Sequence, residues 1–255
     1  MPTADFTLSG KVAIVTGGSR GIGKSIAVAL AEAGADVAVA ARKPEALEEA
    51  VTEIKATGRR AFAIPTNVRE MDGLQNLVAE TKRQLGRIDI LVNNAGTNPV
   101  FGPVHNIDER AWDGIMNTNV KAVFFLSKMA REAMLEHGDG GAIINVSSIG
   151  GIEASDVLGG YSVSKAALIM LTQVCAKNWG KDGIRVNCIA PGLIKTDFSR
   201  ALWENEGILS NSVQTAALGR IGLPDEMAGA VVYFASPASS FTTGQTLVLD
   251  GGRHL

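Results

Sequence analysis

The sequence predicts one α/β domain in which helices cover both faces of a doubly wound, seven-stranded parallel sheet. Short apolar runs alternate with helical patterns along the whole chain, and strands separated by helices form parallel sheets with right-handed crossovers. No linker, repeat or low-complexity tract divides the 255 residues. Hydrophobic residues make up 46% and aromatic residues only 5%, so the core must be mostly aliphatic, which suits buried parallel strands. We therefore expect a single domain over residues 1–255.

The expected strands are continuous aliphatic runs, because a strand covered on both faces has no solvent-facing side. They lie at residues 11–15, 35–41, 61–64, 88–92, 142–146, 184–189 and 246–249. The helical spacing of apolar side chains predicts helices at residues 22–33, 44–55, 71–85, about 111–136, about 161–181 and 225–235. Only residues 193–222 break this alternation. We expect a substrate lid there, because such sheets bind ligands at the carboxyl ends of their strands; the alternative is an ordinary surface excursion.

The composition excludes several classes of function. With 24 basic and 26 acidic residues, the net charge is −2, which predicts no nucleic-acid or membrane surface. The cysteines and histidines lack metal-ligand spacing, so we expect no metal site and two reduced, buried thiols. The cysteines are Cys175 and Cys188, and the histidines, expected in surface positions or loops, are His105, His137 and His254.

The chain also lacks recognisable membrane and targeting segments. No apolar stretch approaches the ~18 residues that cross a bilayer, and residues 1–10 do not resemble a signal peptide. The final Arg253-His254-Leu255 differs from the peroxisomal Ser-Lys-Leu address because Arg253 replaces a small residue, and we treat the similarity as chance. We therefore expect a soluble, cytoplasmic protein.

A glycine-rich turn follows the first expected strand. Gly17, Gly21 and Gly23 lie between this strand and the next helix. Glycines allow a tight turn and let a pyrophosphate approach the backbone, and the N-terminus of the helix offers unpaired N–H groups. This position after the first strand predicts a dinucleotide-binding site.

The Gly-x-x-x-Gly-x-Gly spacing resembles that of the short-chain dehydrogenase/reductase family. The resemblance extends over the whole chain through three further motifs, which are Asn93-Asn94-Ala95-Gly96, Tyr161-Ser162-Val163-Ser164-Lys165 and Pro191-Gly192. It implies a Rossmann-type fold and an oxidoreductase that transfers hydride between a nicotinamide and a carbonyl or secondary alcohol. It also implies a set of cofactor-binding residues: Gly17, Ser19, Arg20, Gly21, Ile22, Gly23, Asn67, Val68, Asn94, Ala95, Gly96, Tyr161, Lys165, Pro191, Gly192, Ile194 and Thr196.

Two positions bear on how the cofactor is recognised. The family usually carries Asp where this chain has Asn67, whose side-chain oxygen can still accept from the adenine amine. In NAD enzymes an acidic residue near the end of the second strand binds the ribose, but here that strand ends in Ala41, Arg42 and Lys43. A guanidinium binds the additional phosphate of NADP, so we expect NADP(H), with Arg42 as the main clamp and Arg20 or Lys43 assisting.

Tyr161 and Lys165 are four residues apart and so share one face of a helix. A nearby cation, together with the positively charged nicotinamide of the oxidised cofactor, favours the phenolate. We expect the two to lower the pKa of Tyr161, so that this residue exchanges a proton with the substrate oxygen. The resemblance places a serine thirteen residues before the tyrosine, which is Ser148, with Ser147 as the alternative. It also implies that Asn119 holds a water that reaches Lys165.

Two loops resemble those of the NADPH-dependent carbonyl and retinal reductase branch, at residues 96–102 and 190–199. Phe101, Leu193, Phe198 and Trp203 are expected to form an apolar substrate pocket, which favours a hydrophobic ketone, aldehyde or dicarbonyl over a sugar. The alternatives are a 3-oxoacyl-[acyl-carrier-protein] reductase, and a non-catalytic NADP(H)-binding sensor or scaffold. The resemblance further implies a homotetramer.

Overall fold

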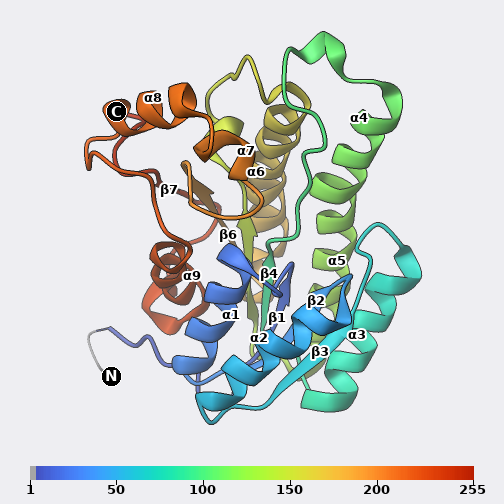
Figure 1. Cartoon of the computed structure of the whole chain (residues 1–255). Helices are drawn as coiled ribbons and strands as arrows, with labels where there is room; N and C mark the ends of the chain where they lie inside the picture. The colour runs from blue at the N-terminus through green and yellow to red at the C-terminus, as the bar shows by residue number, and fades with distance from the viewer. Residues whose placement is uncertain (1–3) are drawn as a thin grey trace.

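The computed structural model describes residues 4–255, in which a seven-stranded sheet runs through the molecule (Figure 1). All strand pairs are parallel, and the strand order is β3-β2-β1-β4-β5-β6-β7. The strands are β1 (Val12–Thr16), β2 (Asp36–Ala41), β3 (Ala61–Pro65), β4 (Ile90–Asn93), β5 (Gly141–Val146), β6 (Ile184–Pro191) and β7 (Thr246–Leu249). The order reverses after β3, so the predicted doubly wound parallel sheet is confirmed, and the point of reversal lies between β1 and β4.

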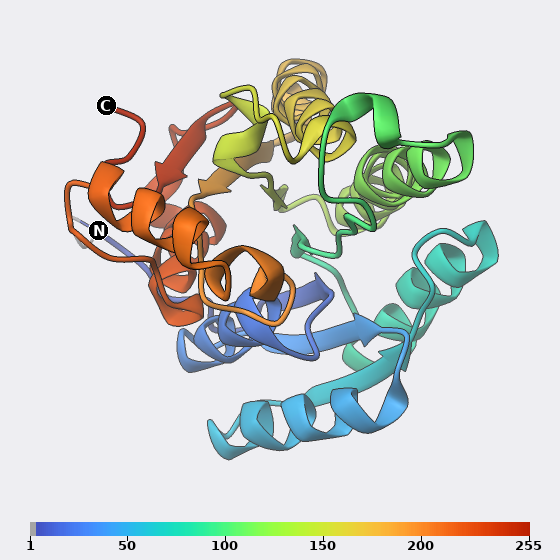
Figure 2. The ribbon, with the colours of Figure 1, turned by 45° about the horizontal axis from the view of Figure 1, so that its top comes forward.

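Two apolar layers bury the sheet. On one face the core includes Ile26 of α1, Leu47 of α2 and Val231 of α9, and on the other it includes Leu77 of α3 and Leu126 of α5. The helices are α1 (Gly21–Glu32), α2 (Pro44–Ala56), α3 (Met71–Leu85), α4 (Glu109–Met116), α5 (Ala122–His137), α6 (Gly159–Trp179), α7 (Arg200–Trp203), α8 (Glu206–Thr215) and α9 (Ala228–Ala235). Figure 2 shows α7 and α8 lying across one end of the molecule, away from these two layers.

The long helix expected at about 111–136 is interrupted. Between α4 and α5, residues Asn117–Lys121 form a π turn, in which the N–H of Ala122 donates to the carbonyl of Asn117, five residues earlier. The apolar pattern continues through this segment, so spacing alone predicted one unbroken helix. The helix expected at 225–235 also differs, since a 3₁₀ turn (Pro224–Met227) precedes α9.

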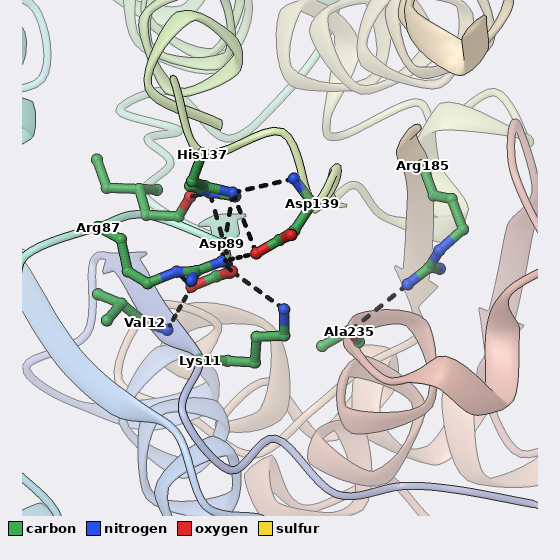
Figure 3. Close-up of polar contacts among 9 residues, drawn as sticks. Lys11, Val12, Arg87, Asp89, His137, Asp139, Arg185 and Ala235 are labelled. Carbon is green, nitrogen blue, oxygen red and sulfur yellow. Dashed lines mark hydrogen bonds and ion pairs between the residues drawn. The ribbon is translucent and has the colours of Figure 1, made fainter. Parts of the chain in front are cut away.

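A charged cluster joins the amino-terminal ends of β1, β4 and β5 (Figure 3). The buried carboxylate of Asp89 accepts from the backbone N–H of Val12 at 3.0 Å and pairs with Lys11 at 3.2 Å and Arg87 at 2.6 Å. His137, expected at the surface or in a loop, is instead the half-buried last residue of α5, and its Nε2 lies 3.0 Å from the carbonyl oxygen of Ile88. This cluster therefore holds the edge of the sheet opposite to the strands' carboxyl ends.

Within residues 4–255, no helix is long and apolar enough to cross a membrane, and no group of three or more His, Cys, Asp or Glu side chains has the geometry of a metal site. Cys175 and Cys188 are both buried and unbridged, as expected. Residues 1–3, part of the expected domain and of the segment examined for a signal peptide, lie outside the described residues.

Candidate active site

A cavity of about 830 Å³ opens at the carboxyl ends of the strands. Segments that follow all seven strands line it, together with residues of α7 and α8. Of the residues predicted to bind cofactor or substrate or to act in catalysis, all but two line this cavity. Those that line it are Gly17, Ser19, Arg20, Gly21, Ile22, Gly23, Arg42, Lys43, Asn67, Val68, Asn94, Ala95, Gly96, Phe101, Ser147, Ser148, Tyr161, Lys165, Pro191, Gly192, Leu193, Ile194, Thr196 and Phe198. The exceptions are Asn119 and Trp203.

The glycine turn is closed too tightly for side chains. A Cβ on Gly23 would lie 2.3 Å from the carbonyl oxygen of Gly17, and one on Gly17, whose φ is +65°, would lie 2.8 Å from Nδ2 of Asn94. That amide donates to the carbonyls of Thr16 at 2.9 Å and Gly17 at 3.1 Å, so Asn94 fixes the turn. Arg20 precedes α1 without a side-chain cap, which leaves the first N–H groups of the helix available for an anion. The turn therefore fits a dinucleotide pyrophosphate.

The cations near the place where we expect the adenosine ribose of the cofactor differ in their ion-pair partners. Arg42 is exposed at the end of β2 and has no ion pair among residues 4–255. Arg20 instead pairs with Asp197 at 3.2 Å, which links the glycine turn to the 193–222 segment. Asn67 uses its side-chain oxygen to accept from the N–H of Arg69 at 3.3 Å, within its own loop.

Tyr161 and Ser148 both line the cavity and contact each other. Burial raises the pKa of Tyr161 to about 12, and a hydrogen bond with the Ser148 hydroxyl only partly opposes this. In the protein without cofactor, desolvation of the phenolate dominates, so the lowering expected from Lys165 together with an oxidised nicotinamide stays a prediction. Ser147, the alternative serine, donates to the carbonyl of Lys165 at 2.9 Å. Its hydroxyl therefore fastens α6 to β5.

Lys165 is buried beneath the tyrosine. Its Nζ donates to the carbonyl of Val146 at 2.8 Å and lies 5.4 Å from the centre of the Tyr161 ring. Burial lowers the pKa of Lys165 to about 8. The i, i+4 spacing on α6 thus brings both groups to the same cavity, as the sequence predicted.

Asn119 lies behind the cavity wall, fully buried in the π turn. Its side-chain oxygen accepts from the N–H of Thr97 at 2.9 Å, and its amide donates to the carbonyl of Thr97 and to the hydroxyl of Ser164, each at 3.0 Å. A Cβ on Gly96 would lie 3.6 Å from the Asn119 oxygen and 3.7 Å from Nζ of Lys165, so both groups flank one backbone position. The side chain of Asn119 therefore ties α6 to the loop after β4.

Trp203 does not line the cavity as predicted. Its Nε1 donates to the carbonyl of Thr196 at 2.8 Å, and Nζ of Lys195 lies 5.5 Å from the ring centre. The indole thus braces the loop after β6. Leu202 and Ile208 line the cavity instead, and sequence reasoning missed them because nothing in the pattern shows which face of α7 and α8 turns inward.

Comparison with known proteins agrees with this arrangement. Residues 17–254 match a family model described as enoyl-(acyl carrier protein) reductase. A curated relative, dehydrogenase/reductase SDR family member 4 of Oryctolagus cuniculus, is 41% identical over 245 residues, covering 96% of this chain and 94% of the relative. The chain belongs to the short-chain dehydrogenase/reductase family. It is accordingly an oxidoreductase that acts on alcohol or carbonyl groups with a nicotinamide cofactor.

Solved structures of this short-chain dehydrogenase/reductase fold superpose closely on the chain. A short-chain type dehydrogenase/reductase from Mycobacterium marinum has a TM-score of 0.93 at 38% identity, with 98% of each chain covered. A gluconate 5-dehydrogenase from Burkholderia cenocepacia, in complex with NADP and tartrate, has a TM-score of 0.93 at 33% identity, covering 99% of this chain and 98% of the other. Other solved relatives hold NAD, so the fold does not by itself choose between the two cofactors.

Proposed function

We propose that this protein is an NADP(H)-dependent oxidoreductase that transfers hydride between the nicotinamide and a carbonyl or secondary alcohol. The observation that carries the proposal is that Tyr161, Ser148 and Lys165 line the same cavity as the glycine turn. The test is NADPH oxidation with a panel of aromatic ketones, diketones and acetoacetyl thioester. Binding of NADPH without turnover of any compound would favour the alternative of a non-catalytic sensor or scaffold.

The protein residues supply the proton and the orientation, while the bound nicotinamide supplies or accepts the hydride. Ser148 and Tyr161 donate hydrogen bonds to the substrate oxygen and so stabilise the negative charge that develops on it. With its pKa raised to about 12 by burial, Tyr161 carries its proton at neutral pH and can give it to the strongly basic alkoxide that develops as the carbonyl is reduced. We propose that Lys165 binds the nicotinamide ribose and that Asn119 holds a water beside it.

The preference for NADP(H) rests on Arg42. The end of β2 carries no carboxylate to repel a phosphate, and the exposed guanidinium of Arg42 has no competing ion pair among residues 4–255. Arg20 is a weaker candidate because Asp197 already engages it. Lys43 also lines the cavity and assists.

Apolar side chains on the cavity wall support a hydrophobic carbonyl compound as the substrate. Phe101, Leu193 and Phe198 line it, and the rings of Phe198 and Tyr161 lie 6.0 Å apart. We propose that the 193–222 segment, which carries α7 and α8, acts as the substrate lid.

The surface needed for an acidic carrier protein is poorly developed, which weighs against a 3-oxoacyl-[acyl-carrier-protein] reductase. Arg131 pairs with Asp182, and Lys128 lies 4.0 Å from Glu132. Lys121, in the π turn before α5, has no ion pair within residues 4–255, and is the one cation of these three that could serve such a surface. Turnover of acetoacetyl thioester in the panel above tests this alternative.

We also propose a homotetramer. Exposed apolar side chains on α5 (Phe124, Leu135) and on α6 (Val163, Met170, Val174) suit pairing with the same helices of a second copy. Leu247 of β7 and the fully exposed Phe241 suit a second two-fold contact. Light scattering coupled to gel filtration measures the mass, and a monomer would contradict the proposal.

A further inference from the structure

One arginine near the end of the chain lines the cavity without a protein partner. Arg253 follows β7 and is half-buried. Its guanidinium makes no ion pair or hydrogen bond with any residue from 4 to 255. An arginine that keeps five N–H donors unused beside a ligand cavity is suited to bind an anion there.

The backbone on both sides of Arg253 is fixed. The carboxylate of Asp250 accepts from the N–H of Gly252 at 2.9 Å and from that of His254 at 2.8 Å. The carbonyl of Gly251 accepts from the N–H of Leu218 at 2.9 Å, which holds the tail against the end of the 193–222 segment. Figures 1 and 2 both show the C-terminus close to α8. The position of Arg253 is therefore set by the fold.

Two of the three carboxylates that line the cavity have other partners. Glu153 pairs with the His254 ring, and Asp197 pairs with Arg20 and Arg200. Asp156 is exposed and has no ion pair within the described residues. Arg253 thus keeps its positive charge available to a ligand.

Arg253 lies on the substrate side of the cavity. The strand order separates β7 from β2, which carries Arg42 at its end, by five strand spacings, or about 24 Å. The adjacent His254 contacts Glu153, which belongs to the segment between Ser148 and Tyr161. The guanidinium therefore lies too far from Arg42 to share the same phosphate, but beside the loop that leads to the reacting groups.

We propose that Arg253 binds a carboxylate on the substrate, so that the substrates are keto acids and the corresponding hydroxy acids with an apolar body. The reacting carbonyl lies at Tyr161, the apolar body lies against Phe198 and Leu193, and the carboxylate pairs with Arg253. This inference rests on the proposed carbonyl chemistry and adds a charge requirement to it.

Matched substrates test the charge requirement. The probes are an aryl ketone with a terminal carboxylate and its methyl ester, which share the same body and reacting carbonyl. We expect Arg253→Gln to lower the ratio of kcat/KM for the acid to that for the ester by about 10- to 100-fold, the scale of a charge-assisted hydrogen bond. Arg253→Lys should recover part of the ratio. Arg110→Gln, which removes an exposed cation of α4 that does not line the cavity, is the matched control and should leave the ratio unchanged.

Binding measurements separate this inference from the proposed function. Calorimetry of the acid with the NADP-loaded protein should show weaker binding to Arg253→Gln than to wild type, whether or not turnover follows. Equal affinity, or an acid-to-ester ratio that does not change, overturns the role of Arg253. Absence of turnover with every carbonyl, while the acid still binds through Arg253, overturns the proposed reaction and leaves the carboxylate site standing.

Discussion

The ammonium group of Lys165 donates to the backbone carbonyl of Val146 at 2.8 Å, so the last residue of β5 holds a buried cation on α6. A second bond runs in the opposite direction: the hydroxyl of Ser147, the next residue, donates to the backbone carbonyl of Lys165 at 2.9 Å. These two bonds join the strand that leads to Ser148 with the helix that carries Tyr161. The proton-transfer groups therefore share one rigid support.

Replacing Tyr161 by Phe should lower kcat by at least ~10²-fold, because the variant lacks the acid that protonates the substrate oxygen. Cofactor affinity and the unfolding temperature should change little. Steady-state kinetics with NADPH measures the loss. Tyr233→Phe is the matched control, since Tyr233 bonds Thr242 at 3.0 Å and lies outside the cavity. Near-normal turnover by Tyr161→Phe would show that another group carries the proton.

The buried ammonium of Lys165 predicts a dependence of stability on pH. Its pKa is about 8 in the folded protein, below its ordinary value of 10.5, so between these values the unfolded chain binds more protons than the native state. Lys165 should therefore add a positive contribution to the slope of the free energy of unfolding as pH rises from about 8 toward 10.5. The raised pKa values of Cys175 and Cys188, about 11, act in the opposite direction above pH 9, in the wild type and in Lys165→Met alike. Denaturant titrations of the cofactor-free protein measure the slope, and Lys165→Met should lack the contribution of Lys165. Parallel curves for the two proteins would contradict the lowered pKa.

Arg42→Asp should shift cofactor preference from NADPH toward NADH. A carboxylate repels the additional phosphate of NADPH and accepts hydrogen bonds from the ribose of NADH. We expect the ratio of kcat/KM for NADPH to that for NADH to fall by about 10²-fold, the scale of losing one or two charge-assisted bonds. Arg110→Asp, which places the same charge change on an exposed position of α4, is the control. An unchanged ratio, or a wild-type preference for NADH, would exclude Arg42 as the clamp.

Asp89→Asn should lower the free energy of unfolding by about 2 to 3 kcal/mol, because this buried carboxylate is the shared acceptor of Lys11, Arg87 and the Val12 N–H. Asp139→Asn, whose side chain is 57% exposed, should destabilise the protein much less. Urea unfolding compares the two variants. Since the cluster lies at the edge of the sheet away from the cavity, kcat should stay unchanged in both variants. Equal destabilisation of the two would show that the burial of Asp89 does not contribute to stability.

The strands and most helices could be predicted because their signals are local. A run such as residues 142–146 is aliphatic throughout, and the spacing from Tyr161 to Lys165 fixes one face of a helix. The glycine turn was predictable because its glycines follow the first strand directly: Gly17 has a φ of +65°, and a Cβ on Gly23 would clash with the carbonyl of Gly17 in the same turn.

What sequence reasoning missed depends on tertiary contacts. The inward orientation of Leu202 and Ile208 follows from how α7 and α8 lie on the molecule, and Trp203 turned away because Thr196 offers its indole an acceptor. The raised pKa of Tyr161 depends on how completely the fold removes its hydroxyl from water. The position of Arg253 depends on Asp250 and His254, which hold the tail in place.

The π turn at Asn117–Lys121 means that α4 and α5 are out of phase with each other. Each residue of an α-helix advances the side-chain direction by about 100°, so the additional residue in this turn offsets the two helices by nearly a third of a revolution. Deletion of one residue from this turn would leave the sequence of α5 unchanged. It would nevertheless rotate Leu126 and Met134 of that helix away from the core. The number of residues in this turn therefore matters as much as their identity, because it determines which face of α5 packs on the core.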